Sequence, residues 1–273
     1  MDKEELMLRK RLADLSNRAF QRDIVTFSDF LNLNELHILH TTPKDMLPAR
    51  YETFGGYGLS ERQMIAFLPD ALYYVPKETD LQPDSSRKTA EYRLPPGYKY
   101  PIQAAAIRPL NQKFAEKLSH RDYLGSVMNL GVERSKFGDI IVLDDEAIIF
   151  LCEEIADYVT SNLTRIRHTA VQCTRREIKD ISYTPSFCEL KGTVPSVRLD
   201  TVMSVAFPMS RSRLTAYIAA GKVFVNGKLM TSNGYRLEEG NLISVRGLGR
   251  ISYEGILSET KKGRYYISVR KYS

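Results

Sequence analysis

The sequence predicts an α+β protein built from three folded regions, on the basis of three observations. The chain has 273 residues, more than a typical single domain, and 43% of them are hydrophobic, which is enough for packed cores. Apolar residues recur at helical spacing near the N-terminus, predicted strands and helices alternate in the middle, and basic residues gather toward the C-terminus. We expect a small, mostly helical domain at 1–75, a second domain at 76–184 and a third at 185–273.

The N-terminal region is predicted to be mostly helical. Leucines and alanines recur near the 3.6-residue period up to about Leu39, and Ser28 is expected to cap a second helix. Residues 50–58 should form a turn-rich link because they end in three glycines around a tyrosine. A capping box at the start of residues 60–68 predicts a helix there, and residues 72–75 are expected to form a strand.

The middle region follows the order β-α-β-β-α-β. Its predicted strands and helical segments are, in order, 102–107 (strand), 111–128 (broken helix), 139–143 and 147–151 (strands), 153–163 (helix) and 169–174 (strand). This order is that of the ferredoxin-like α/β plait. Plaits often bind single-stranded RNA on the sheet through exposed aromatic residues, and Phe150 is the main aromatic residue of these strands. RNA binding and a structural or docking role are both open for this domain.

The basic stretch from Val197 to Arg250 predicts two helices at its start. Apolar residues repeat at helical spacing in residues 199–206, so one face of the first helix is apolar. Ser210 or Ser212 can cap the second helix, whose first turn then presents backbone N–H groups and arginine side chains to an anion. Because arginine binds phosphate through two parallel hydrogen bonds, this turn is a candidate phosphate site.

A hairpin is predicted after these helices. Gly221 suits a helix C-terminus, where a positive φ is common, and Asn226-Gly227 is the strongest short hairpin signal. Strands are therefore expected on both sides of this turn and near residues 240–247. Two further strands, at 251–256 and 265–270, should extend the same sheet.

Positive charge is concentrated in the C-terminal third. Residues 195–273 contain 13 Lys and Arg against 5 Asp and Glu, a local charge of +8, and the rest of the chain carries 26 against 28, a charge of −2. Such a distribution is typical of a module that binds a polyanion. Residues 184–197 contain two prolines and are predicted to be the hinge that joins this module to the rest of the chain.

Taken in order, these motifs resemble a known RNA-binding module. The S4-type RNA-binding domain shows a similar succession of Arg198-Leu199-Asp200, Ser210-Arg211-Ser212-Arg213, Gly-Lys-Val-Phe-Val-Asn-Gly-Lys at 221–228 and Gly-Asn-Leu-Ile-Ser-Val-Arg-Gly at 240–247. The stretch at 118–131 resembles the middle domain of one family that carries this module. The whole chain therefore resembles the YlmH type of S4-domain proteins of Gram-positive bacteria.

This resemblance implies a function on the ribosome. The family binds ribosomal RNA and tRNA on the large ribosomal subunit with peptidyl-tRNA, and it acts in ribosome-associated quality control, the rescue of stalled nascent chains. There it supports tail elongation by an accessory factor. Its genes commonly lie near cell-division genes, which implies an indirect link to division. We expect a cytoplasmic monomer that uses no cofactor.

The candidate RNA contacts lie mostly in the basic stretch. The main set consists of Arg198, Asp200, Ser210, Arg211, Ser212, Arg213, Lys222, Asn226, Lys228, Arg246 and Arg250. Secondary candidates elsewhere in the chain are Arg121, Arg134, Arg264 and Tyr266.

Two other classes of function are alternatives. S4-type modules are often fused to RNA-modifying enzymes such as pseudouridine synthases or methyltransferases, and Arg198-Leu199-Asp200 is similar to a synthase triplet. No Gly-rich loop for S-adenosylmethionine follows a predicted strand, and His120-Arg121-Asp122 lacks the other kinase motifs. We therefore expect no catalytic residues. The remaining alternative is a division adaptor whose basic module binds acidic proteins.

Composition and motif spacing bear on membrane association, the redox compartment and metal binding. The sequence has no run of some eighteen apolar residues, and its charged N-terminus is unlike a signal peptide, so no membrane partner is expected. The three cysteines lack metal-site spacing and fit a reducing compartment. His37 and His40 lack further ligands, and the acidic run at 144–146 suits a tight turn between strands, so we expect no metal.

Overall fold

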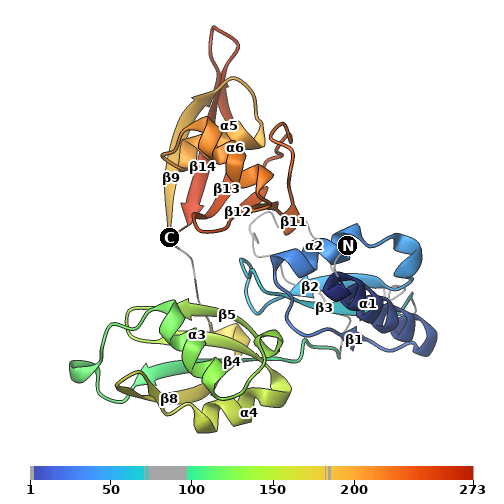
Figure 1. Ribbon diagram of the computed structural model, residues 1–273, viewed down its shortest axis with the longest axis vertical. Helices are drawn as coiled ribbons and strands as arrows, with labels where there is room; N and C mark the ends of the chain where they lie inside the picture. Colours follow the sequence, from blue (N-terminus) through green and yellow to red (C-terminus); the bar gives the residue numbers. More distant parts are fainter. Residues whose placement is uncertain (1–2, 71, 73–96, 182, 184–185, 273) are drawn as a thin grey trace, which may run out of the picture. The chain divides into compact units, whose positions relative to one another are not determined.

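The computed structural model describes residues 3–70, 72, 97–181, 183 and 186–272. The chain forms two compact units, Met1–Ser182 and Tyr183–Ser273 (Figure 1), called here the N-terminal and C-terminal units. Both contain helices and strands, which confirms the α+β class. The two predicted domain boundaries, at 75/76 and 184/185, fall outside the described residues and stay predictions.

The first part of the N-terminal unit contains two helices and a small sheet. Its elements are α1 (Lys3–Arg22), β1 (Thr26–Phe27), α2 (Leu33–Thr41), β2 (Arg50–Phe54) and β3 (Met64–Leu68), with a short 3-10 turn at Lys44–Met46. The strands pair antiparallel in the order β1-β3-β2. Leu12 and Ala19 of α1 pack with Leu36 of α2 and with Ile65 and Phe67 of β3. Two helices are present as predicted, although the second begins later than expected, and the sheet was not predicted.

Three local predictions for this part are wrong. Residues 60–68 contain strand β3 instead of a helix, because a short apolar run buried on both faces has no periodicity that separates strand from helix. Residues 50–58 contain strand β2 as well as the predicted turn. The second helix starts after Asn32, whose side chain accepts hydrogen bonds from the backbone of Asn34 and Glu35. Of the strand predicted at 72–75, only Leu72 is described.

The second part of the N-terminal unit is the predicted plait. Its elements are β4 (Ile102–Pro109), α3 (His120–Asn129), β5 (Phe137–Val142), β6 (Ala147–Cys152), α4 (Glu153–Asn162), β7 (Arg165–Ile166) and β8 (Thr169–Arg176), with 3-10 turns at Gln112–Phe114, Arg134–Lys136 and Ile178–Asp180. The sheet order is β5-β6-β4-β8-β7 with antiparallel neighbours. Without the two-residue β7, this is the strand arrangement of a ferredoxin-like fold, so the β-α-β-β-α-β prediction is confirmed.

The two faces of the plait sheet are covered differently. Helices α3 and α4 pack on one face, where Val127 and Val159 meet Ala105, Ile107 and Ile149 in a single core (Figure 1). On the other face, the outward side chains of β4 and β6 alternate with this core set, and they are also buried: Ala104, Ala106, Ile148 and Phe150. The first part of the chain supplies this second cover.

Phe150 of β6 is in direct contact with the first part of the chain. The Tyr57 ring stacks on the Phe150 ring with centroids 5.4 Å apart and planes 19° apart. Gly56, with φ +101°, lies so near the same ring that an added Cβ would be 2.2 Å from it. Phe150 is 0% exposed. The main aromatic residue of the predicted sheet is therefore a core residue, and its ring face is taken by Tyr57.

Two charged side chains hold the cover to the plait. Asp139 of β5 accepts hydrogen bonds from the Tyr57 hydroxyl (2.9 Å) and from the backbone N–H groups of Glu61 (2.7 Å) and Arg62 (3.1 Å). The Arg62 guanidinium donates to the carbonyl oxygens of Phe30, Arg134 and Phe137. Because each donor and acceptor has a partner, these buried polar groups stabilise the packing of one part on the other.

The C-terminal unit is a six-stranded antiparallel sheet with two helices on one face (Figure 1). Its elements are β9 (Phe187–Val194), α5 (Leu199–Ala206), α6 (Arg211–Ala219), β10 (Val223–Val225), β11 (Lys228–Leu229), β12 (Leu242–Val245), β13 (Gly249–Glu259) and β14 (Tyr265–Tyr272), in the sheet order β11-β10-β12-β13-β14-β9. The core contains Val202 and Met203 of α5, Leu214 and Ile218 of α6, and inward residues of the strands.

Most local predictions for this unit are confirmed, and one is wrong. Asn226 and Gly227 have φ values of +49° and +77°, as a tight hairpin turn requires, and they join β10 to β11. The two strands predicted to extend the sheet are β13 and β14. The predicted hinge at 184–197, however, contains strand β9, which pairs along the whole of β14. Pro195 directly follows the strand, and Pro185 lies outside the described residues.

Candidate nucleic-acid interface

The start of α6 is capped as the sequence predicts. The Ser210 hydroxyl accepts a hydrogen bond from the Arg213 backbone N–H (3.4 Å) and lies 3.1 Å from the Ser212 hydroxyl. Ser210 follows the break after α5 at Phe207 and Pro208, so the chain turns sharply before the new helix begins. The first turn of α6 carries Arg211 and Arg213, both exposed. Positive side chains and the positive end of a helix therefore meet at one place.

Asp200 on α5 gathers two arginines beside this helix start. Asp200 is 1% exposed, and its Oδ2 accepts hydrogen bonds from Arg211 Nε (2.8 Å) and Nη2 (2.5 Å). Arg198 Nη2 donates to the same oxygen at 3.4 Å, and Arg198 Nε lies 3.2 Å from Oδ1. The side chains of Arg198 and Arg211 remain 41% and 55% exposed. A buried carboxylate thus fixes two exposed guanidinium groups.

This arrangement prepares the arginines for an anion. Each guanidinium has five N–H donors, and Asp200 uses only part of them. Both side chains are partly exposed, and their ion pairs with Asp200 already restrict their freedom, which lowers the entropy cost of binding a phosphate. One carboxylate against two guanidinium groups also leaves net positive charge. Two guanidinium groups held in this way suit the binding of a phosphate group.

Tyr235 and Arg236 belong to the same surface, and sequence reasoning missed them. Leu199 N–H donates to the Tyr235 carbonyl (2.9 Å), and Arg198 forms an isolated antiparallel bridge with Arg236. Arg236 is exposed and pairs with no acidic side chain in the described ranges. The loop between β11 and β12 has no periodic pattern, and its return to α5 depends on backbone pairing far along the chain. The one signal in the sequence that could have pointed to Arg236 is its position in the basic C-terminal third of the chain.

A second basic group lies beyond the other end of α6. Gly221, with φ +65°, ends the helix. The Lys222 ammonium then lies over the Tyr217 ring at 5.3 Å, and the Arg246 guanidinium lies over the Phe224 ring at 5.3 Å. The Arg246 backbone N–H donates to the Lys222 carbonyl at 2.9 Å. Because α6 has nine residues, about 13 Å separates its two ends.

The other predicted residues of the basic stretch are arranged around the sheet. The Asn226 side chain accepts a hydrogen bond from Leu242 N–H (2.9 Å), so it supports the hairpin turn. Lys228 is exposed at the start of β11, and Arg250 pairs in register with Ser244 on the sheet. The RNA contacts of these three residues stay predictions.

The secondary candidates differ in their surroundings. Arg121 is exposed on α3. Arg134 donates to the carbonyl oxygens of Phe137 (2.7 Å) and Gly138 (3.2 Å), and burial lowers its pKa to about 10. Arg264 donates to the Thr193 carbonyl (3.2 Å), and Tyr266 is exposed on the β13–β14 hairpin. Arg134 therefore has a structural role within the chain, whatever else it contacts.

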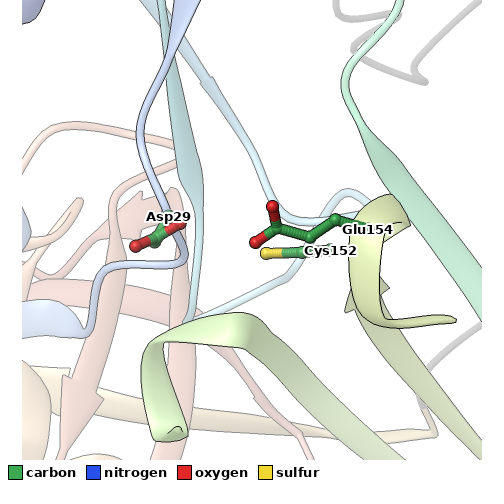
Figure 2. Close-up of side chains that lie close together, drawn as sticks. All are labelled: Asp29, Cys152 and Glu154. Atoms are coloured by element: carbon green, nitrogen blue, oxygen red, sulfur yellow. The ribbon is translucent and has the colours of Figure 1, made fainter. Parts of the chain in front are cut away.

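One group of side chains has the composition of a metal site. Asp29, Cys152 and Glu154 place one ligand atom each within 4.8 Å of one another (Figure 2). The Lys136 ammonium, however, lies 3.0 Å from Asp29 Oδ1 and 2.6 Å from Glu154 Oε1. Hydrogen bonds to Glu154 and Asp29 raise the pKa of Lys136. Because an ammonium already neutralises the carboxylates, we assign this group as an ion-pair network between the two parts of the N-terminal unit.

The buried thiols are poor nucleophiles. Burial raises the pKa of Cys152 to about 12 and that of Cys173 to about 11, so both are protonated at neutral pH.

Other titratable groups of the N-terminal unit also have partners within that unit. Burial and the nearby Arg134 lower the pKa of His120. The acidic run at 144–146 contributes Glu146 to an ion pair with Arg108 at 2.6 Å. None of these groups lies in the arginine cluster around Asp200.

Comparison with known proteins finds family models and similar proteins that match both units. A family model described as "Putative RNA-binding domain in YlmH" matches residues 95–180, and a model of the S4 domain matches residues 197–243. The ribosome-associated protein quality control protein P2 of Bacillus subtilis is 28% identical over 221 residues, which are 80% of this chain and 76% of that protein. The solved structure of cell division protein YlmH from Streptococcus pneumoniae matches with a TM-score of 0.46 and 21% identity, over 66% of this chain and 95% of that one.

The family models coincide with the structural features described above. The first covers the plait, and the second covers the capped start of α6, the Asp200 cluster and the loop that carries Arg236. Within the described ranges, no helix has the length and apolar character needed to cross a membrane. The two family models match this chain in the order that the sequence motifs predict, a YlmH-type domain followed by an S4 domain.

Proposed function

We propose that this protein is a non-catalytic RNA-binding factor whose C-terminal unit holds the sugar–phosphate backbone of ribosomal RNA and tRNA. The observation that carries the proposal is the buried Asp200 carboxylate, which fixes Arg198 and Arg211 beside the capped start of α6. Two fixed guanidinium groups and a helix N-terminus together favour phosphate. Arg213 and Arg236 add positive charge to the same surface.

The mode of binding follows from the residue types. Phosphate contacts give affinity without base readout, and they make binding fall steeply with salt. The second group, Lys222 and Arg246, lies about one α6 length from the first, so a folded RNA can contact both ends of the helix. The protein then recognises the shape of a structured RNA through its backbone.

The partner is inferred from the relative and from the family resemblance. The Bacillus subtilis protein is named for ribosome-associated quality control, and it aligns with most of this chain. We infer that the present chain acts in the cytoplasm as a monomer on the large ribosomal subunit with peptidyl-tRNA, where stalled nascent chains are rescued. A link to cell division is indirect in this proposal and follows from translation.

The arginine cluster favours binding over RNA modification. A modifying enzyme that used the Arg198-Leu199-Asp200 triplet would need the Asp200 carboxylate to reach an RNA base. In this chain Asp200 is almost completely buried and ion-paired with two arginines. Its position suits the support of a binding surface.

Arg213 provides the cleanest test of the proposal. Its guanidinium is exposed and pairs with no acidic side chain among the described residues, so Arg213→Ala leaves no buried charge unpaired. We expect weaker binding of the full-length protein to large ribosomal subunits and to tRNA, with a salt slope lower by about one. Arg18→Ala on α1 is the matched control because Arg18 is likewise exposed and without an ion pair in the described ranges. Equal binding of both variants across a salt titration would overturn the proposal.

A further inference from the structure

One strip of the plait sheet stays open where the rest is covered. On β8, Thr169, Val171 and Cys173 are inward, and the alternate residues face the other side and are exposed. These outward residues are Ala170, Gln172, Thr174 and Arg176. Outward positions along a strand repeat about every 7 Å, so they form a regular row.

Neighbouring strands widen this row. Arg165 of β7 pairs with Ala170, and Arg108 of β4 pairs with Gln172, so both lie on the same face as the outward residues. Both arginines are exposed. We call this surface the β7–β8 strip; it consists of Arg108, Arg165, Ala170, Gln172, Thr174 and Arg176. It begins where the cover over Phe150 ends, since Ala104 and Ala106 beside it on β4 are still buried.

The strip is positively charged, and two of its arginines form no ion pair with the described residues. Glu146 pairs with Arg108 at 2.6 Å. In contrast, Arg165 and Arg176 form no ion pair with any residue that the structure describes, and neither β7 nor β8 contains an acidic residue. Arg175, between two strip positions, points to the helix side and pairs with Asp157 of α4. Free guanidinium groups are thus confined to one face of the strand.

The centre of the same sheet face is closed to a nucleic acid. Single-stranded RNA binds plaits by stacking bases on exposed aromatic residues. Here Phe150 is buried, and the Tyr57 ring already stacks on it. Any RNA contact on this face must therefore use the strip, where arginine, glutamine and threonine offer hydrogen bonds and no aromatic ring offers stacking.

We propose that the β7–β8 strip binds an RNA backbone, as a second contact in addition to the arginine cluster of the C-terminal unit. The inference rests on the proposed function and adds the surface by which the plait takes part in it. RNA fits better than a protein partner because the strip lacks the large apolar anchors that dominate protein interfaces. Arginine, glutamine and threonine instead donate to phosphate and 2′-hydroxyl oxygens.

The test uses the full-length protein with large ribosomal subunits and tRNA as separate probes. The double variant Arg165→Ala/Arg176→Ala should bind at least one of them roughly tenfold more weakly at moderate salt, with a salt slope lower by about two. Arg175→Ala is the control for the loss of one arginine from β8, since its side chain lies on the opposite face of the same strand as Arg176. It should bind both probes as the unchanged protein does.

A second variant guards against a folding defect. Gln172→Glu places an acid on the exposed strip without removing an ion pair, and it should also weaken binding while the melting temperature stays unchanged. Normal binding of both probes by the folded strip variants, with weaker binding by Arg213→Ala, would overturn this inference and leave the proposed function standing. Equal losses in the strip variant and in Arg175→Ala would also overturn it. Normal binding by Arg213→Ala would instead overturn the proposed function.

Discussion

Two pairs of arginines, one pair in each unit, have opposite surroundings. In the N-terminal unit, Arg62 is 9% exposed and donates to three backbone carbonyl oxygens. Arg134 donates to one of these, that of Phe137, and to the carbonyl oxygen of Gly138. In the C-terminal unit, Arg198 and Arg211 share one buried carboxylate and remain about half exposed. The first pair completes the interior of the fold, and the second pair is displayed at the surface.

The comparison shows why a count of positive residues does not locate an RNA site. A guanidinium whose donors are taken by carbonyl oxygens has few left for a phosphate, whereas one held by a single carboxylate keeps several. In the proposed function the buried Asp200 carboxylate therefore supports the binding surface, although its negative charge by itself would repel RNA. The partners of an arginine, more than its charge, decide which of the two roles it has.

The largest expected effect comes from the interior arginine. Arg62→Ala removes the side-chain donor from the carbonyl oxygens of Phe30 and Arg134, and one of two such donors from that of Phe137. We therefore expect the free energy of unfolding of the N-terminal unit to fall by about 3 kcal/mol. Amide hydrogen exchange should rise in β3 and β6 and stay unchanged in β10 and β12. Unchanged exchange in β3 and β6 would show that the cover is not held by Arg62. Arg18→Ala is the control for loss of one arginine.

Removal of the buried acid should act on the surface arginines. Asp200→Asn raises the net charge by one, so charge alone predicts tighter RNA binding. Because the carboxylate fixes Arg198 and Arg211, we expect the opposite, a roughly tenfold loss of affinity for tRNA, as for the loss of two phosphate contacts. Circular dichroism should first establish that the variant is folded at the assay temperature. Tighter binding by the folded variant would contradict the positioning role of Asp200.

A smaller effect is expected at Arg236, which the structure adds to the surface. Arg236→Ala should weaken binding of large ribosomal subunits about threefold, as expected for the loss of one phosphate contact. The backbone bridge between residues 198 and 236 does not depend on the side chain, so the fold should stay intact. The neighbouring Tyr235→Phe, which removes only a hydroxyl group, is the control for changes in this loop. Binding at the unchanged level would remove Arg236 from the site.

Local signals in the sequence predict the main parts of this structure. The plait follows from alternating elements joined by short loops, and the β10–β11 hairpin follows from Asn226-Gly227. The cap of α6 and its arginines are adjacent in the chain, so they can be recognised from the motif alone. These predictions depend on residues that are near one another in sequence.

The features that the sequence does not reveal depend on distant pairing. Strand β3 has an apolar run that fits a helix equally well until its neighbours β1 and β2 are known. The two prolines near strand β9 favour the prediction of a hinge, and the strand is recognised only by its pairing with β14. Arg236 reaches the site because its loop returns to α5, and the burial of Phe150 depends on Tyr57, which is 93 residues earlier in the chain. No local pattern encodes these contacts.

The most direct test of the account is the salt dependence of tRNA binding by the triple variant Arg198→Ala/Asp200→Ala/Arg211→Ala. This variant removes both fixed arginines together with the carboxylate that they neutralise, so no buried charge is left unpaired. Its net charge falls by one, as in Arg18→Ala. We predict that the salt slope falls by about two in the triple variant and stays unchanged in Arg18→Ala. The same slope in both variants would contradict the claim that these arginines hold the RNA backbone.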